Sequence, residues 1–174
     1  MKKVISIFAL LAVVFTLSAN AQKDKSKRPS PPDSVAQTIK SGALVSINYS
    51  KPSLKGRTIG KDVEPMQGKV WRAGANEITV FSTSKDVKVE GQALPAGKYG
   101  LYVLNDGKDY WVIFNKVWND WGTNYDKYKD QDVLKAKAKA KKADKAADVL
   151  TYTIDKNGKV DLWWGDLDLE FSVK

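Results

Sequence analysis

Residues 166–173, Asp-Leu-Asp-Leu-Glu-Phe-Ser-Val, decide the fold of this chain. Apolar residues alternate with acidic or hydroxyl residues through the whole stretch, which is the period of two that a β-strand requires. In a strand buried on one face, such a pattern puts every apolar side chain in the core and every acidic side chain in solvent. The stretch therefore predicts a sheet with one covered face.

The same period extends upstream through several shorter segments. Asn105-Asp106-Gly107-Lys108 separates two of them and predicts a hairpin turn, because Asp-Gly tolerates the positive φ of tight hairpins. The chain shows no convincing long amphipathic helix, so eight or nine short strands predict an all-β fold, a single antiparallel β-sandwich. The expected strands cover residues 45–50, 78–80, 87–89, 99–103, 110–114, 149–154, 159–164 and 167–173.

The Lys/Ala run between Val133 and Lys145 is ambiguous, because both residue types favour helix while their order follows the strand period. At helical spacing the lysines would scatter around the axis, whereas at strand spacing they form one solvated row opposite an alanine face. We expect a strand. The row is interpreted as a solvated face, as protection of an exposed sheet edge, or as a contact to an anionic envelope surface; it comprises Lys135, Lys137, Lys139, Lys141 and Lys142.

The first residues predict export. A positive start, an apolar run from Val4 to Leu17 and the small-x-small end Ala19-Asn20-Ala21 together predict a signal peptide, residues 1–21, cleaved after Ala21. The run is shorter than the roughly 20 residues that span a bilayer, so no transmembrane segment is expected in the mature chain. Residues 22–34 predict a flexible Lys/Pro-rich leader, residues 35–174 the β domain, and the compartment is periplasmic or extracellular.

Composition excludes several classes of chemistry. The chain has no histidine and no cysteine, which rules out a Ser-His-Asp triad, a cysteine nucleophile and a zinc site of imidazole or thiolate ligands. No phosphate-binding glycine motif or calcium-loop spacing appears, so neither a cofactor nor a metal is expected. Cleavage of the expected signal peptide removes Lys2 and Lys3, which leaves 27 of the 29 basic residues against 20 acidic ones. The mature chain would thus carry a formal net charge of +7. Export argues against nucleic acid as the partner of this charge.

A polar, glycine-rich passage interrupts the strand pattern and is the candidate site. It contains Gly56-Arg57-Thr58-Ile59-Gly60 and Trp71-Arg72-Ala73-Gly74-Ala75-Asn76-Glu77. Guanidinium groups grip carboxylate, phosphate or sulfate through paired hydrogen bonds, so a small polar, anionic or glycan-like ligand is expected. The expected ligand-binding residues are Arg57, Arg72, Asn76, Glu77, Trp71, Trp118, Trp121 and Tyr125.

Other interpretations of these residues stay open. Arg72 could form an internal ion pair with Glu77, Asn76 could cap a turn, and the aromatic residues could anchor a long loop. A carboxylate-based hydrolase of envelope glycans would use Glu77 with Glu64 or Asp126, and Asp62 and Asp120 lie near the same passage. A structural, envelope-associated protein held by its lysines is the third alternative.

The motifs also carry a family resemblance. Asn48-Tyr49-Ser50-Lys51-Pro52, Gly56-Arg57, the run from Trp71 to Glu77, and Ala96-Gly97-Lys98-Tyr99 together resemble the bacterial domain of unknown function 2911. Trp121-Gly122 with Tyr125 fits the same pattern. The resemblance covers nearly all of the mature chain and implies an exported β domain. No activity is established for that family, so the resemblance implies no mechanism.

Overall fold

The computed structural model describes residues 24–174. The expected signal peptide and its cleavage site after Ala21 lie outside the described residues. Within residues 24–174 there is no α-helix, and no helix is both long and apolar enough to cross a membrane. The elements are the single 3-10 turns η1 (Lys25–Lys27), η2 (Tyr125–Lys127) and η3 (Lys129–Gln131), and the strands β1 (Pro32–Thr38), β2 (Leu44–Ser50), β3 (Val70–Trp71), β4 (Thr79–Thr83), β5 (Val87–Val89), β6 (Gln92–Leu94), β7 (Gly97–Asn105), β8 (Tyr110–Asn115), β9 (Asp132–Ile154) and β10 (Lys159–Ser172).

One antiparallel sheet makes up most of the domain. Its strands follow the order β1, β2, β4, β7, β8, β9 and β10, and β3 adds to the side of β7. The hairpin of β5 and β6 forms a second, two-stranded sheet. Hydrogen bonds between Lys88 and Lys174 tie this hairpin to the end of β10.

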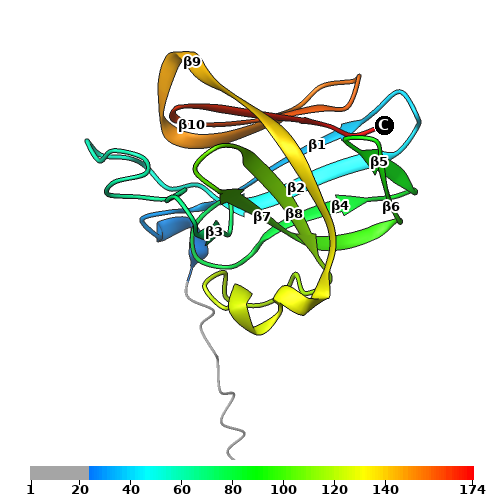
Figure 1. The fold of residues 1–174 in the computed structure, drawn as a ribbon, viewed down its shortest axis with the longest axis horizontal. Helices are drawn as coiled ribbons and strands as arrows, with labels where there is room; N and C mark the ends of the chain where they lie inside the picture. The colour runs from blue at the N-terminus through cyan, green and yellow to red at the C-terminus, as the bar shows by residue number, and fades with distance from the viewer. Residues whose placement is uncertain (1–23) are drawn as a thin grey trace, which may run out of the picture.

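Strand β9 curls the sheet. Its first residues pair with β8 as far as Ala138, and the rest pairs with β10, beginning at Lys139 opposite Glu170. A bridge between Ser53 and Val149 attaches the segment after β2 to the same long strand. Figure 1 shows β9 sweeping across the domain, so that β10 lies opposite the first strands.

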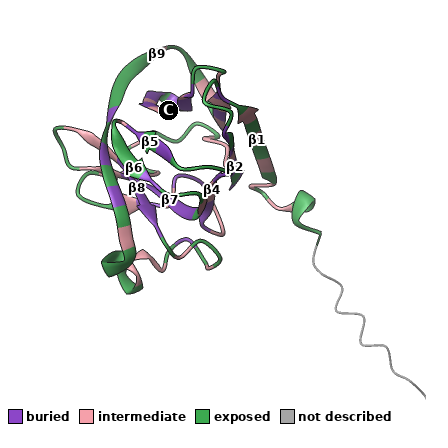
Figure 2. Ribbon diagram, turned by 90° about the vertical axis from the view of Figure 1, so that its right-hand side faces the viewer, coloured by how far each residue is buried: buried purple, intermediate pink, exposed green. Residues whose placement is uncertain are grey.

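The core fills the space that the curled sheet encloses. Figure 2 shows buried residues along β4, β7 and β8 and exposed residues along much of β1 and the middle of β9. The largest fully buried side chains are Trp164, Tyr102, Phe81, Phe114 and Phe171. A separate small cluster of Ile78, Tyr102 and Ile113 lies on the other face of the sheet, with Tyr125 packed against it.

The structure confirms the all-β, antiparallel class and the strand assignment of residues 133–145. It differs in arrangement from the predicted sandwich of eight or nine strands, because eight strands form one curled sheet and two more form a separate small hairpin. The lysine row lies along β9, where Lys135 and Lys137 stand opposite β8, and Lys139, Lys141 and Lys142 stand opposite β10. Ala136 and Ala138 face the core opposite the lysines, as the strand period requires.

The prediction that every acidic residue after Gly165 faces solvent is wrong for Asp168. Asp166 is exposed, Glu170 is half-buried, and Asp168 is buried beside Lys141, which stands opposite it on β9. Asp168 lines a cavity together with residues 143–147 of β9, next to the point where the register between β9 and β10 shifts, so this segment lies close to the outer face of β10 there. Period alone could not show that a second element covers this face.

The segment expected to be a flexible leader has defined contacts from Asp24 onward. Strand β1 begins at Pro32, before the expected start of the domain at residue 35, and Asp33 forms an ion pair with Lys51 at 2.9 Å. No residue of β1 is fully buried and prolines precede it, so the sequence has no clear apolar period from which this edge strand could be predicted.

Candidate functional site

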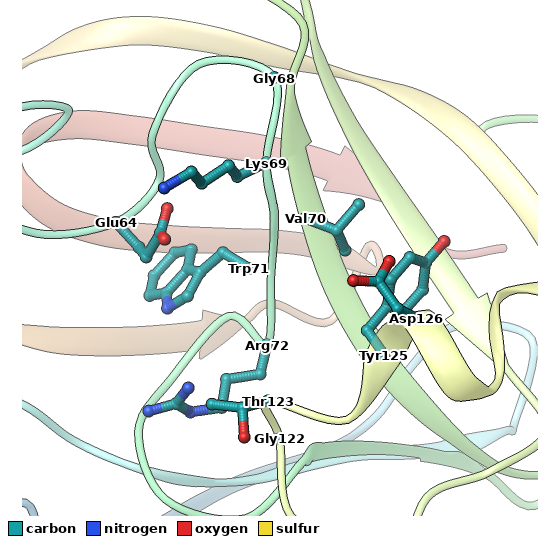
Figure 3. Close-up of a pocket in the computed structure, with 10 residues that line it drawn as sticks. All are labelled: Glu64, Gly68, Lys69, Val70, Trp71, Arg72, Gly122, Thr123, Tyr125 and Asp126. Atoms are coloured by element: carbon teal, nitrogen blue, oxygen red, sulfur yellow. The ribbon is translucent and has the colours of Figure 1, made fainter.

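Two cavities flank the short segment from Val70 to Arg72. Trp71, Arg72 and Glu64 line both of them. One cavity has a volume of about 350 Å³ and continues toward Lys69, Thr123, Tyr125 and Asp126. Figure 3 shows Glu64, Lys69, Trp71 and the guanidinium of Arg72 on one side of this segment, and Val70, Tyr125 and Asp126 on the other.

The second cavity has a volume of about 310 Å³ and brings the two predicted arginines together. Arg57 from the loop after β2 and Arg72 both line it, next to Trp71. Trp164 of β10 also lines this cavity and donates a hydrogen bond from its indole N–H to the backbone oxygen of Glu64, at 2.8 Å. The long loop between β2 and β3 is therefore fixed to the core where it passes the site.

A tight turn after Arg72 fixes the direction of that side chain. Ala73 and Asn76 adopt φ values of 50° and 59°, in the left-handed region. The carbonyl of Ala73 accepts hydrogen bonds from the Tyr152 hydroxyl at 2.7 Å and from the Thr79 hydroxyl at 3.1 Å. The Trp71 indole N–H donates to the carbonyl of Gly74 at 2.9 Å. Core side chains thus hold the turn, and the Trp-Arg-Ala-Gly-Ala-Asn-Glu motif folds around them.

Arg72 is a half-buried cation without a bonded acidic partner. Among residues 24–174, no carboxylate lies within ion-pair distance of its guanidinium, and its buried Nε has no hydrogen-bond acceptor. Burial lowers the pKa of Arg72, and the nearby charges of Glu64 and Tyr102 partly oppose that effect. A guanidinium still stays charged at neutral pH, so the group retains strong unmet hydrogen-bonding capacity.

Gly122 forms the surface on which Arg72 rests. A Cβ at Gly122 would collide with Cδ of Arg72 and lie 2.9 Å from its Cβ and Cγ. The backbone of this second loop runs beside the motif, because Gly122 N donates to the carbonyl of Asn76 and Ile78 N donates to that of Asp120, both at 3.1 Å. The two sequence motifs, Trp71 to Glu77 and Trp121-Gly122, therefore meet at Arg72.

Glu77 lies outside both cavities and holds the N-terminal segment. Arg28 donates to both carboxylate oxygens at 2.9 Å, and Lys25 Nζ lies 3.1 Å away. Burial raises the pKa of Glu77, but hydrogen bonds from Arg28, the backbone and Lys25 outweigh this effect and lower it to about 2. The partner of Glu77 is thus Arg28, and Glu77 does not pair with Arg72.

Arg57 and Asn76 act largely on the backbone. Arg57 donates from Nε to the carbonyl of Leu54 at 2.9 Å and from Nη2 to that of Ser53 at 2.7 Å, and it still lines the second cavity. Asn76 donates from Nδ2 to the carbonyl of Ser30 at 3.0 Å. Asn76 therefore positions the N-terminal segment, whose Ser30 forms one wall of that cavity.

The aromatic residues of the loop after β8 divide between two roles. Tyr125 lines the first cavity and anchors the loop, because its hydroxyl donates to Asp132 at 2.6 Å and its ring packs on Tyr102. Burial, followed by this hydrogen bond, raises the pKa of Tyr125. Trp118 and Trp121 are 37% and 45% exposed and line neither cavity. The Lys98 ammonium lies 4.9 Å from the ring centroid of Trp118.

The candidate carboxylates are spread over different tasks. Asp120 accepts hydrogen bonds from Asn124 and Tyr128 and stabilises its own loop. Asp62 accepts from the backbone of Thr58 in the loop that carries Arg57. Glu64 and Asp126 line the same cavity, but in Figure 3 they lie on opposite sides of the segment from Val70 to Arg72. Residues 24–174 contain no group of three or more side chains suited to hold a metal ion.

Sequence reasoning missed several residues of the site. Ser30, Lys69, Thr123 and Trp164 line the cavities, and none of them carried a local signal. Trp163 and Trp164 are adjacent in β10 and therefore face opposite sides of the strand, and the structure buries Trp164 and leaves Trp163 half-buried. The ring of Tyr102 packs against the ring of Tyr125. The alternation along β7 puts Tyr102 on the face of the sheet away from the main core.

Fold and site together define a single curled β domain with an arginine-walled cavity between two loops. A family model described as "Protein of unknown function (DUF2911)" matches residues 30–173, and the chain belongs to this family. No curated protein matches the chain, and no solved structure matches it either.

Proposed function

We propose that this protein is an exported, non-catalytic binding module for a small anionic polar ligand, such as an acidic sugar. The half-buried guanidinium of Arg72, unpaired among the described residues, carries the proposal. A buried cation without a partner costs free energy that a bound anion would offset. Export is inferred from residues 1–21 of the sequence and a periplasmic or extracellular location follows from it.

The cavity supplies further groups that suit an acidic sugar. Trp71 offers part of an aromatic wall, Arg57 adds a second guanidinium, and Ser30 and Asp62 add polar atoms for hydroxyl groups. A volume of about 310 Å³ suits a ligand of monosaccharide size. Asn76 and Glu77 contribute indirectly, by holding the segment that includes Ser30. Trp118, Trp121 and the alternative roles of Glu77 in hydrolysis receive no support from this geometry.

The test is a titration of the protein with glucuronate, using glucose as the neutral control. We expect glucuronate to bind with a dissociation constant of about 1 mM that rises with added salt. Glucose should show no binding in the same concentration range. Arg72→Ala should abolish binding, and Arg72→Lys should weaken it at least about tenfold, because an ammonium cannot form the planar pair of hydrogen bonds.

Lys98→Ala is the matched control, because it removes one positive charge from a residue that lines neither cavity. It should leave the dissociation constant unchanged within about twofold. If the wild-type protein bound glucose as well as glucuronate, or if Arg72→Ala bound glucuronate normally in a folded state, the proposal would be wrong.

A further inference from the structure

A third cavity lies under the bend of β9, separate from the Arg72 site. Between the pairs Leu167–Lys142 and Gly165–Ala147, one residue of β10 stands opposite residues 143–146 of β9. These four residues bow away from β10, and we refer to them as the arch. Figure 1 shows this part of β9 leaving the line of its partner strand. The cavity beneath has a volume of about 410 Å³ and is lined by Ala143, Asp144, Lys145, Ala146, Ala147, Trp163 and Asp168.

Asp168 gives this cavity an incompletely satisfied carboxylate. Its side chain is only 9% exposed, and its Oδ1 has no hydrogen-bond donor among the described residues. Its Oδ2 lies 3.3 Å from Nζ of Lys141, whose own side chain is 60% exposed. A carboxylate can accept about four hydrogen bonds, and burying one without compensation is costly. The group therefore favours an additional cationic donor over any neutral or acidic one.

Trp163 and the arch complete a site for such a cation. Trp163 points to the opposite side of β10 from the buried Trp164, because adjacent residues in a strand alternate, and it lines the cavity with Asp168. An indole face attracts ammonium groups, by about 0.5–1 kcal/mol at exposed sites. The methyl groups of the arch alanines, such as Ala143, provide an apolar wall that an alkyl chain can cover.

The charges around the cavity do not repel a cation. Asp144 and Lys145 belong to the arch, and Asp168 and Lys141 face each other across β9 and β10. The two carboxylates and the two ammonium groups balance. Among the described residues Lys141 is the cation within ion-pair distance of Asp168, so a ligand cation would compete with it, and that side chain can move into solvent at little cost because it is already mostly exposed.

We propose that the arch cavity binds a primary alkylammonium ion. Its ammonium group would pair with the carboxylate of Asp168 beside the ring of Trp163, and its alkyl chain would lie against the arch. This site takes a ligand of opposite charge to the Arg72 site and does not depend on the function proposed for that site.

The experiment is an NMR titration of the protein with n-pentylammonium chloride, followed at the indole N–H of Trp163 and the amides of the arch. 1-Pentanol serves as the uncharged ligand of the same shape. We expect saturable shifts with a dissociation constant of about 1 mM for the amine, and at least tenfold weaker binding of the alcohol. Asp168→Asn should weaken amine binding at least about tenfold, and Asp166→Asn, a change at an exposed carboxylate on the same strand, should leave it unchanged.

Lys141→Met separates a ligand site from a purely structural ion pair. If Lys141 competes for Asp168, removing its charge should tighten amine binding about two- to tenfold, even where it lowers stability. Equal binding of 1-pentanol, unchanged binding by Asp168→Asn, or weaker binding by Lys141→Met would each overturn the proposal. Shifts confined to Arg57 and Arg72 would overturn it as well.

Discussion

The contacts of Glu77 with Arg28 and Lys25, called the Glu77 clasp below, give the sharpest test of how the N-terminal segment is held. Glu77→Gln keeps the shape of the side chain and removes its charge. The fall in the pKa of Glu77 from its ordinary 4.5 to about 2 is equivalent to about 3 kcal/mol. Because the side chain is 37% exposed, solvent screening reduces the expected contribution to about 1 kcal/mol. The loss should lower the melting temperature by about 2–4 °C at pH 7.

The pH dependence of this effect has a definite sign. A carboxylate whose pKa is lower in the folded protein stabilises the fold above its unfolded-state pKa, and the contribution disappears as the pH falls through the folded-state pKa. The difference between wild type and Glu77→Gln should thus be full above about pH 5, less than half at about pH 3, and lost as the pH falls below about 2. Urea unfolding at pH 7 and at pH 3 measures it.

Matched variants distinguish the clasp from a general loss of charge. Arg28→Ala should destabilise the protein about as much as Glu77→Gln, and the double variant should lose less than the two single losses together, because both remove one interaction. Lys27→Ala is the control, since Lys27 is exposed in the same turn and lies 3.9 Å from Asp24. A pH-independent effect of Glu77→Gln, or additive losses in the double variant, would refute the assignment.

Two glycine substitutions test the close contacts around the site. Gly122→Ala should displace Arg72, lower stability by about 1–3 kcal/mol and weaken glucuronate binding at least tenfold; normal binding measured by calorimetry would contradict this packing. Gly165→Ala adds a Cβ at φ 60° that would lie 2.6 Å from Cδ1 of Ile59, so urea unfolding should show a larger loss than Gly91→Ala, where φ is 82° but no atom lies within 4 Å. Equal losses would show that backbone strain alone decides both sites.

The strands that were predicted share a local signal. Residues 166–173 and the Lys/Ala run of β9 follow the strand period over many positions, and both form strands. Strand β3 has only two residues, too few for a period, and β6 has three residues of which only Leu94 is buried, so it lacks the alternation that marks Val87 and Val89 of β5. Strand β3 pairs with β7, which is distant in the sequence, so a local pattern gives no sign of that contact, whereas β6 forms a hairpin with its neighbour β5.

The site was predicted in part for the same reason. Composition marked Arg57, Arg72 and Trp71, and the structure brings these three to one cavity. Composition could not show that Glu77 pairs with Arg28, because nothing in the spacing of 49 residues between them predicts a contact. Ion pairs between distant segments follow from the fold, and the sequence revealed only that the charges exist.

The placement of Arg72 also explains why the two motifs belong together. Arg72 is positioned by the turn at Ala73 from one side and by the backbone of Gly122 from the other. A purely structural arginine would be expected to end on a carboxylate or a carbonyl, as Arg28 and Arg57 do. Among the described residues Arg72 does neither, although two loops are shaped around it. Precise support for an unsatisfied charge beside a cavity costs stability, and the anion binding that we propose would account for this cost.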